Sequence, residues 1–135
     1  MTLFVCLDDE GGMAFGGRRQ SRDSRVTEDI FRECGGAPLL IAPYSEKLLS
    51  SFGKVKVKDS PLASAKKDSL VFLEERAVGD GIKKVDKIVI YRWNRHYPAD
   101  LYFDIEPEKE GFTLDSSTDL EGSSHEKITK EIYTK

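Results

Sequence analysis

Several features that mark specialised classes of protein are scarce or absent in this chain of 135 residues. It has only two cysteines, Cys6 and Cys34, whereas a small secreted domain stapled by disulfides would need more. The longest apolar run, residues 38–43, is far shorter than the ~20 apolar residues that cross a bilayer. No charged segment leads into a long apolar stretch, as it would in a secretory signal. The sequence therefore predicts a cytoplasmic protein with no membrane contact.

Metal-ligating residues and excess positive charge are also lacking. His96 and His125 are the two histidines, 29 positions apart, and the cysteines do not form the paired spacings of a thiolate zinc site. The sequence predicts no bound metal. The net charge of −3 excludes a uniformly basic nucleic-acid-binding protein.

The composition is that of an ordinary globular domain. Apolar residues make up 39% of the chain, and the 11 glycines bring the sum near the usual value. Charged residues, at 33%, are more frequent than the usual ~25%. Together with the length, these values predict one domain, residues 1–135, with one core and a well-solvated surface.

Apolar runs and turn residues predict strands that alternate with helices in the first half of the chain. The second half is rich in strands and has little helix. This order predicts an α/β fold, a three-layer sandwich with a mixed, mostly parallel sheet. The expected strands are residues 1–7, 39–42, 54–58 (exposed or at an edge), 69–73, 87–93 and 101–105, and the expected helices are 24–34 and 45–52, the second capped by Ser45.

The local sequence leaves the C-terminal segment, residues 123–135, open. Ser123 followed by Glu126 resembles a capping box, and Ile128 and Ile132 are four apart, which favours a helix. The same isoleucines also fit one face of a strand, with Lys130 between them and snorkelling outward.

The order of elements, with its turn residues, resembles dihydrofolate reductase. The segments that carry the resemblance are MTLFVCLDDEGG followed by MAFGGRRQ, PLLIAPYSEKLL, VDKIVIYRWNRHYPADLYFDI with Asp100 and Phe103, and SSHEKITKEIYTK. The resemblance implies a trimmed version of that fold and a loop near residues 12–20 that closes over the active site. It also implies that Phe31 lies against a ligand. It makes the C-terminal segment a strand, over residues 127–134, antiparallel to a strand from the region 87–105.

This chain departs from the family at positions that carry its chemistry. Aligned through Phe31, the catalytic carboxylate position holds Thr27, with Glu28 and Asp29 beside it. Glu74-Glu75 stands where a glycine pair would hold the cofactor pyrophosphate. The middle of the chain, which would carry most of the adenosine site, is short. We therefore expect no ordinary reductase activity and no NADPH, and we predict no cofactor.

The sharpest functional feature is an arginine-rich loop. Residues 15–27 hold four arginines and one aspartate, two glycines precede them, and a predicted helix begins directly after. Guanidinium groups and helix N-termini both bind anions. The alternative is a solvated loop whose arginines pair with Asp8, Asp9 and Glu10. The candidate ligand-binding residues are Arg18, Arg19, Gln20, Ser21, Arg22, Asp23, Phe31, Tyr44 and Ser45.

Other residues give weaker signals. Glu28 and Asp29 could act as general acid or base, although acidic residues are common in the first turn of any helix. His125 follows Ser123 and Ser124, but neighbours in sequence rarely reach the geometry of a nucleophile and base. The Trp93–Tyr97 cluster could stack on bases, although a lone Trp after a buried strand is more often core. Residues 100–122, with eight acidic side chains and one lysine, favour a solvated acidic face.

Two functions remain open from the sequence. The first is a protein on a dihydrofolate-reductase-like scaffold that binds an anionic small molecule, such as a nucleotide or pteridine derivative, through the arginine loop. The second is a non-enzymatic interaction module that binds a partner protein or RNA through the arginine loop and the acidic C-terminal surface.

Overall fold

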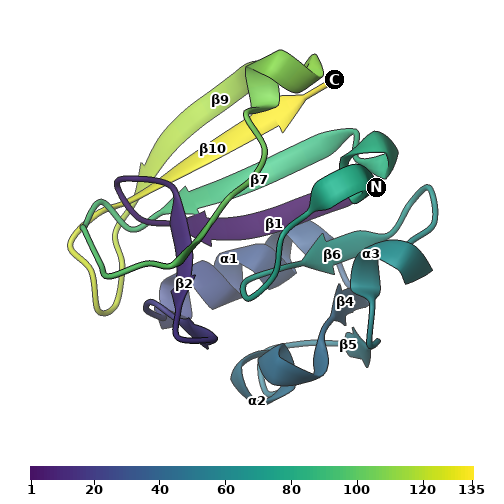
Figure 1. Ribbon diagram of the computed structural model, residues 1–135. Helices are drawn as coiled ribbons and strands as arrows, with labels where there is room; N and C mark the ends of the chain where they lie inside the picture. The colour runs from purple at the N-terminus through teal and green to yellow at the C-terminus, as the bar shows by residue number, and fades with distance from the viewer.

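A seven-stranded mixed sheet forms the centre of the computed structural model, which describes residues 1–135. From one edge to the other, the strands run in the order β5-β4-β6-β1-β7-β10-β9 (Figure 1). Four of the six pairings are parallel, and the two that involve β10 are antiparallel. The strands are β1 Thr2–Leu7, β4 Leu39–Ile41, β5 Val55–Val57, β6 Leu70–Phe72, β7 Lys87–Arg92, β9 Thr113–Leu120 and β10 Ile128–Thr134.

This architecture confirms the predicted fold class. The parallel strands are β1, β4, β5, β6 and β7, and the antiparallel additions lie at one side of the sheet. β5, with its alternating Lys and Val, is an edge strand, as expected. The predicted strand at residues 101–105 is the exception. Only β8, Leu101–Tyr102, forms there, and it joins β2 (Gly12–Phe15) and β3 (Arg18–Arg19) in a separate three-stranded sheet.

The C-terminal segment is a strand, and the prediction from the resemblance is confirmed. β10 pairs antiparallel with β7, with Thr134 opposite Lys87 and Thr129 opposite Arg92. Ile128 is fully buried in the core. Without β10, one edge of β7 would have no partner strand. Pairing with β7 and burial of Ile128 therefore favour a strand in the C-terminal segment over the helix that the local sequence favours.

Helix α1, Ser24–Cys34, agrees with the predicted bounds. Asp23 caps its N-terminus by accepting from the backbone N–H of Arg25, and Gly35 ends it in the left-handed conformation, with φ of 59°. Its buried face presents Val26, Ile30 and Cys34 to the sheet.

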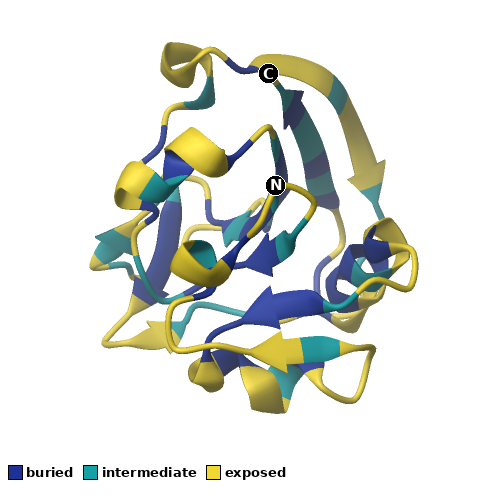
Figure 2. Cartoon of the chain, turned by 90° about the vertical axis from the view of Figure 1, so that its right-hand side faces the viewer, coloured by how far each residue is buried: buried dark blue, intermediate teal, exposed yellow.

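The core consists of two layers because the central strands are buried on both faces. In β1, Leu3 and Val5 belong to one layer and Phe4 to the other. The layer with Phe4 is covered by α1 and by α2, Glu46–Leu49, which follows η1, Pro43–Ser45. Over the opposite layer lie α3 (Pro61–Ser64), η2 (Gly79–Lys84) and η3 (Pro107–Glu110). β9, by contrast, is mostly exposed, and it is the long yellow strand of Figure 2.

Two local predictions are wrong. Ser45 makes no capping hydrogen bond; its hydroxyl instead donates to Glu74. Lys130 does not snorkel outward, because α1 lies over this part of the sheet and supplies two carboxylates to its ammonium.

No helix is long and apolar enough to span a membrane.

Candidate functional site

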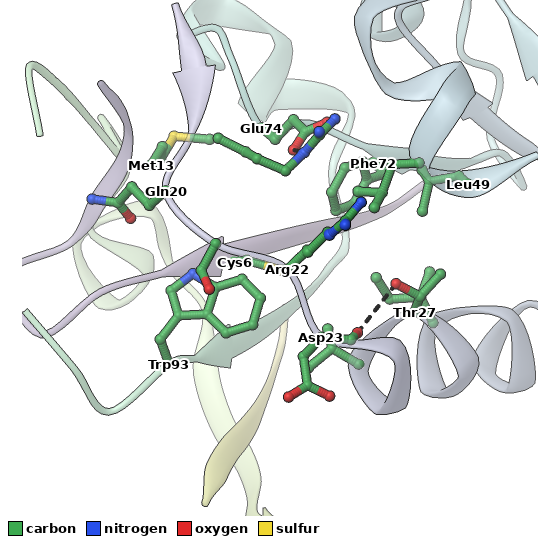
Figure 3. A pocket seen from close by; sticks show the side chains of 15 residues that line it. Cys6, Met13, Gln20, Arg22, Asp23, Thr27, Leu49, Phe72, Glu74 and Trp93 are labelled. Atoms are coloured by element: carbon green, nitrogen blue, oxygen red, sulfur yellow. Dashed lines mark hydrogen bonds and ion pairs between the residues drawn. The ribbon is translucent and has the colours of Figure 1, made fainter. Parts of the chain in front are cut away.

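A pocket lies beside the carboxyl ends of β1, β6 and β7 and the start of α1. In parallel sheets this edge is where ligands bind, because loops diverge there. The pocket is narrow, with a cavity volume of about 20 Å³. The pocket is lined by Cys6, Met13, Arg19, Gln20, Ser21, Arg22, Asp23, Val26, Thr27, Ile30, Leu48, Leu49, Phe72, Glu74 and Trp93 (Figure 3).

One wall of the pocket is an internal ion pair. Arg19 donates from Nε and Nη2 to the two carboxylate oxygens of Glu74, at 2.9 and 3.0 Å. The Ser45 hydroxyl donates to the same carboxylate at 2.6 Å, and the Arg19 guanidinium lies over the ring of Tyr44. Glu74 is buried. Arg19 therefore has its charge compensated within the protein, where the sequence suggested a ligand.

Arg22 differs from Arg19 because its guanidinium has neither a hydrogen bond nor an ion pair within the protein. In Figure 3 its side chain extends along the pocket from the side of Asp23 toward Phe72 and Leu49. Asp23, the nearest acidic residue in sequence, directs its oxygens to other donors. Arg22 is exposed to solvent and also lines the pocket, so it adds a positive charge without a protein partner beside mostly apolar walls.

Asp23 joins the start of α1 to the turn between β9 and β10. Its Oδ1 accepts from the backbone N–H groups of Arg25 and Ser123, and its Oδ2 accepts from those of Ser124 and His125. Burial alone would raise the pKa of Asp23, but these N–H groups and the His125 ring lower it well below its usual value. Asp23 therefore stays anionic and cannot supply a proton to a ligand.

His125 lies between this carboxylate and a hydroxyl on the pocket wall. Its Nδ1 is 3.0 Å from Asp23 Oδ2, and its Nε2 is 3.1 Å from Ser21 Oγ and 3.0 Å from the Tyr97 hydroxyl. The acceptor at Nδ1 assigns the ring proton to that nitrogen, which leaves Nε2 as the acceptor. Trp93 stacks on the ring, with centroids 4.7 Å apart.

The remaining predicted site residues lie away from the pocket. Arg18 and Glu28 are exposed. Phe31 packs against the backbone of Gly53, where it leaves no room for a side chain. Asp29 is buried under α1 and bonds to the Tyr91 hydroxyl at 2.7 Å and to the Lys130 ammonium at 2.7 Å.

The structure also decides the alternative in which the arginines pair with nearby acidic residues. Asp8 is buried and accepts instead from the backbone N–H groups of Gly12, Glu10 and Tyr97 and from the Gln20 amide. Neither Asp9 nor Glu10 pairs with an arginine. The predicted pairing is therefore wrong, although Arg18, Arg22 and Arg25 are exposed to solvent, as that interpretation of the loop expects.

Thr27 lies in the pocket at the position that the resemblance gives to the catalytic carboxylate. It is buried, and its hydroxyl donates to the Asp23 carbonyl oxygen at 3.3 Å. No group of three or more metal-ligating side chains is present anywhere in the chain. The sequence did not indicate the partners of Glu74 and His125, since both residues reach them through the fold, across 55 and more than 100 positions.

Comparison with known proteins identifies the fold but no family from sequence. No protein-family model matches the chain, and no curated protein is similar to it in sequence. A dihydrofolate reductase from Enterococcus faecalis, solved in complex with NADP(H) and RAB-propyl, superposes with a TM-score of 0.66. The match covers 98% of this chain and 94% of that chain, at 11% sequence identity. The chain thus has a dihydrofolate-reductase-like fold.

Proposed function

We propose that this protein binds a small anionic molecule with a flat or apolar body in the pocket beside α1. The observation that carries this proposal is the Arg22 guanidinium, which lines a mostly apolar pocket and has no partner in the protein. A guanidinium without a protein partner can form charge-assisted, bidentate hydrogen bonds to an anionic group, while the apolar walls contact the rest of the ligand. A nucleotide or a pteridine derivative has the required chemistry.

The narrowness of the pocket bears on how a ligand would enter. Because little open space remains between the side chains, the ligand must displace part of the Arg22 side chain. Arg22 would then move from the pocket onto the anionic group of the ligand. The reductase of similar fold binds NADP(H). In this protein, Glu74 stands where a phosphate-binding loop would be needed, and its carboxylate is already paired with the Arg19 guanidinium.

We also propose that the protein lacks ordinary dihydrofolate reductase activity. Thr27 has no acidic proton, Asp23 is held as an anion, and Glu74 is bound by Arg19 and Ser45. The pocket therefore holds no carboxyl group free to protonate a substrate. NADPH oxidation with dihydrofolate at an ordinary enzymatic kcat, roughly 1–10³ per second, would contradict this proposal.

The binding proposal is tested by thermal-shift and calorimetric titration with nucleotides, folates, NADPH, aryl carboxylates and short RNAs. A ligand at 100 times its Kd should raise stability by about 2.7 kcal/mol. Arg22→Ala should weaken binding at least about tenfold, because a charge-assisted contact is lost.

Arg25→Ala is the matched control. Arg25 is exposed on the first turn of α1, three residues further on, and its side chain has no hydrogen bond. It should leave the affinity for a small ligand unchanged. If Arg22→Ala and Arg25→Ala weaken RNA binding equally and no small molecule binds, the protein is instead an interaction module that uses the whole loop.

A further inference from the structure

Three side chains outside the reductase-like features have the arrangement of an activated nucleophile. We propose that Ser21 is the nucleophile of an ester hydrolase, that His125 is its general base, and that Asp23 positions the imidazole. The proposal takes its substrate from the pocket described above, and it adds a reaction to the binding proposed there.

The distances are those required for proton transfer. Ser21 Oγ lies 3.1 Å from His125 Nε2, and His125 Nδ1 lies 3.0 Å from Asp23 Oδ2. A nucleophile within about 3.2 Å of a base, which a third group orients in turn, is the diagnostic geometry of such sites. The base and its carboxylate are buried, with 2% and 0% of their side chains exposed. Ser21 is half-buried and lines the pocket, so the hydroxyl is the member that a substrate can reach.

The other hydroxyls of the cluster are already committed. Ser123 bonds to Asp23 Oδ1, and the Ser124 hydroxyl donates to the Arg22 carbonyl oxygen at 2.8 Å. Ser21 Oγ contacts only His125 Nε2 and the Tyr97 hydroxyl. Stacking on Trp93 and the bond to Asp23 fix the plane of the imidazole.

Two backbone N–H groups at and next to the nucleophile are without partners. The backbone N–H groups of Ser21 and Arg22 donate to no acceptor in the protein. Oxyanion holes are commonly built from such N–H groups at or next to the nucleophile. The Arg22 guanidinium can hold an anionic group elsewhere on the substrate, which indicates esters of small dicarboxylic or other anionic acids as the substrate class.

The reaction balances with water as the only co-reactant. Ser21 Oγ bonds to the ester carbonyl carbon while its proton moves to Nε2 of His125. The bond to the alcohol oxygen breaks, and Nε2 protonates the leaving alkoxide. Water then attacks the acyl-serine and gives a proton to Nε2, which returns it to Ser21 Oγ as the carboxylic acid leaves.

The test uses a fluorophosphonate probe followed by intact and peptide mass spectrometry. We expect one phosphonyl group per chain, on Ser21. Ser21→Ala should abolish labelling, and Ser117→Ala, which removes an exposed serine on β9, should not change it. His125→Ala should slow labelling by about 10²–10⁴-fold. His125→Gln, which keeps a donor near Asp23, serves as the second variant if the alanine variant does not fold.

A thiol variant keeps the test valid if the probe does not fit the narrow pocket. In Ser21→Cys, the introduced thiol should react with iodoacetamide at pH 7 at least tenfold faster than in the variant that also carries His125→Ala. The background is low because burial raises the pKa of Cys6 far above its usual value and that of Cys34 to about 11. Equal rates with and without His125 would overturn the proposal, as would labelling of Ser21 that does not depend on His125.

Asp23 requires a readout that a structural role alone would not change. Nitrogen-15 NMR of His125 should show the Nδ1–H tautomer in the wild type and a mixture in Asp23→Asn. An Nε2–H tautomer in the wild type would contradict the assigned base.

The two proposals fail differently. Hydrolysis of 4-nitrophenyl acetate and mono-4-nitrophenyl succinate at equal kcat/KM would contradict the anion site and leave the triad intact. Anion binding that depends on Arg22, without Ser21 labelling or ester hydrolysis, would contradict the triad and leave the anion site intact.

Discussion

Helix α1 contributes to two buried carboxylate clusters that hold the charge in different ways. At the N-cap, Asp23 is solvated by backbone N–H groups and by the His125 imidazole. In the middle of the helix, Asp29 meets the ammonium of Lys130 and the hydroxyl of Tyr91. Both clusters tie α1 to the C-terminal part of the chain, the first through the β9–β10 turn and the second through β10.

The two clusters differ in whether the carboxylate has a partner that also faces the pocket. The Asp23 cluster has one, His125, and the Asp29 cluster has none. Neutral donors keep Asp23 charged and leave one nitrogen of its imidazole partner directed at Ser21 and the pocket. The Lys130 ammonium neutralises Asp29 and also bonds to Glu33, so this cluster is closed on itself under the helix. Asp23, whose hydrogen bonds come from neutral groups, can therefore orient the His125 imidazole as a base. Asp29, which is paired with the Lys130 ammonium, has no base among its partners.

Lys130→Met should have the largest effect on stability. It removes the buried cation and leaves Asp29 with only the exposed Arg32 guanidinium as a counter-ion, so we expect a loss of up to about 3–5 kcal/mol. Urea unfolding measures the loss. Lys127→Met, on the exposed residue before β10, is the control and should cost less than ~0.5 kcal/mol. Equal losses would show that the Lys130 ammonium does not stabilise the buried Asp29 carboxylate.

Asp23→Asn should cost about 1–3 kcal/mol at pH 7, because several N–H donors lose their charged acceptor. The pKa of Asp23 is lower in the folded protein than in the unfolded chain, where it is about 3.9. The charged form therefore stabilises the fold above about pH 4, and this contribution is lost as the pH falls further.

The gap in unfolding free energy between wild type and Asp23→Asn should accordingly narrow between pH 5 and pH 2. Asp8, whose pKa is also lowered by backbone N–H groups despite its burial, contributes equally to both proteins. Asp9→Asn, at an exposed position, is the control and should show a small gap at every pH. A gap for Asp23→Asn that stays constant with pH would mean that its charge does not stabilise the turn.

Gly122→Ala tests how closely the turn fits around Asp23. A Cβ at this position would collide with the His125 carbonyl oxygen and lie 2.6 Å from Asp23 Oδ2. The His125 backbone and the Asp23 carboxylate, whose oxygens already accept several hydrogen bonds, cannot shift easily. We therefore expect the free energy of unfolding to fall by about 1–3 kcal/mol. Gly81→Ala is the control, since its Cβ would meet only the Leu62 side chain, at 3.0 Å. A tolerated Gly122→Ala would indicate a looser turn.

Arg32→Ala should have the smallest effect. Arg32 bonds to the same Asp29 as Lys130, at 3.3 Å, but its side chain is 76% exposed. An exposed pair of this kind contributes about 0–1 kcal/mol, since water screens it. Thermal unfolding of Arg32→Ala and Lys130→Met side by side thus compares two cations on one carboxylate that differ in burial.

Much of the scaffold was predictable because its signals are local. The bounds of α1 follow from Val26, Ile30 and Cys34 at helical spacing and from Gly35 after them. The buried strands follow from apolar runs between turn residues. β10 needed more, since Ser123, Glu126 and two isoleucines four apart favour a helix locally, and only the resemblance to a known fold indicated a strand.

The candidate site was predictable in part. The arginine loop does border the pocket, but its arginines have different environments that the sequence could not separate. Arg19 is neutralised by Glu74, 55 positions away, and Arg22 is not. Phe31 was assigned to the ligand, yet it packs on Gly53, because a helix position alone does not say which side of the helix meets the pocket.

By itself, the sequence determined where the chain forms strands and α1 and that an arginine-rich loop precedes this helix, because propensity, periodicity and capping act over a few residues. Only the tertiary structure decided that His125, which also contacts its neighbour Ser124, meets Ser21 and Asp23. The reason is that the β9–β10 turn reaches the start of α1 only once β10 has paired with β7. A contact across some hundred positions depends on that register and leaves no pattern in the local sequence.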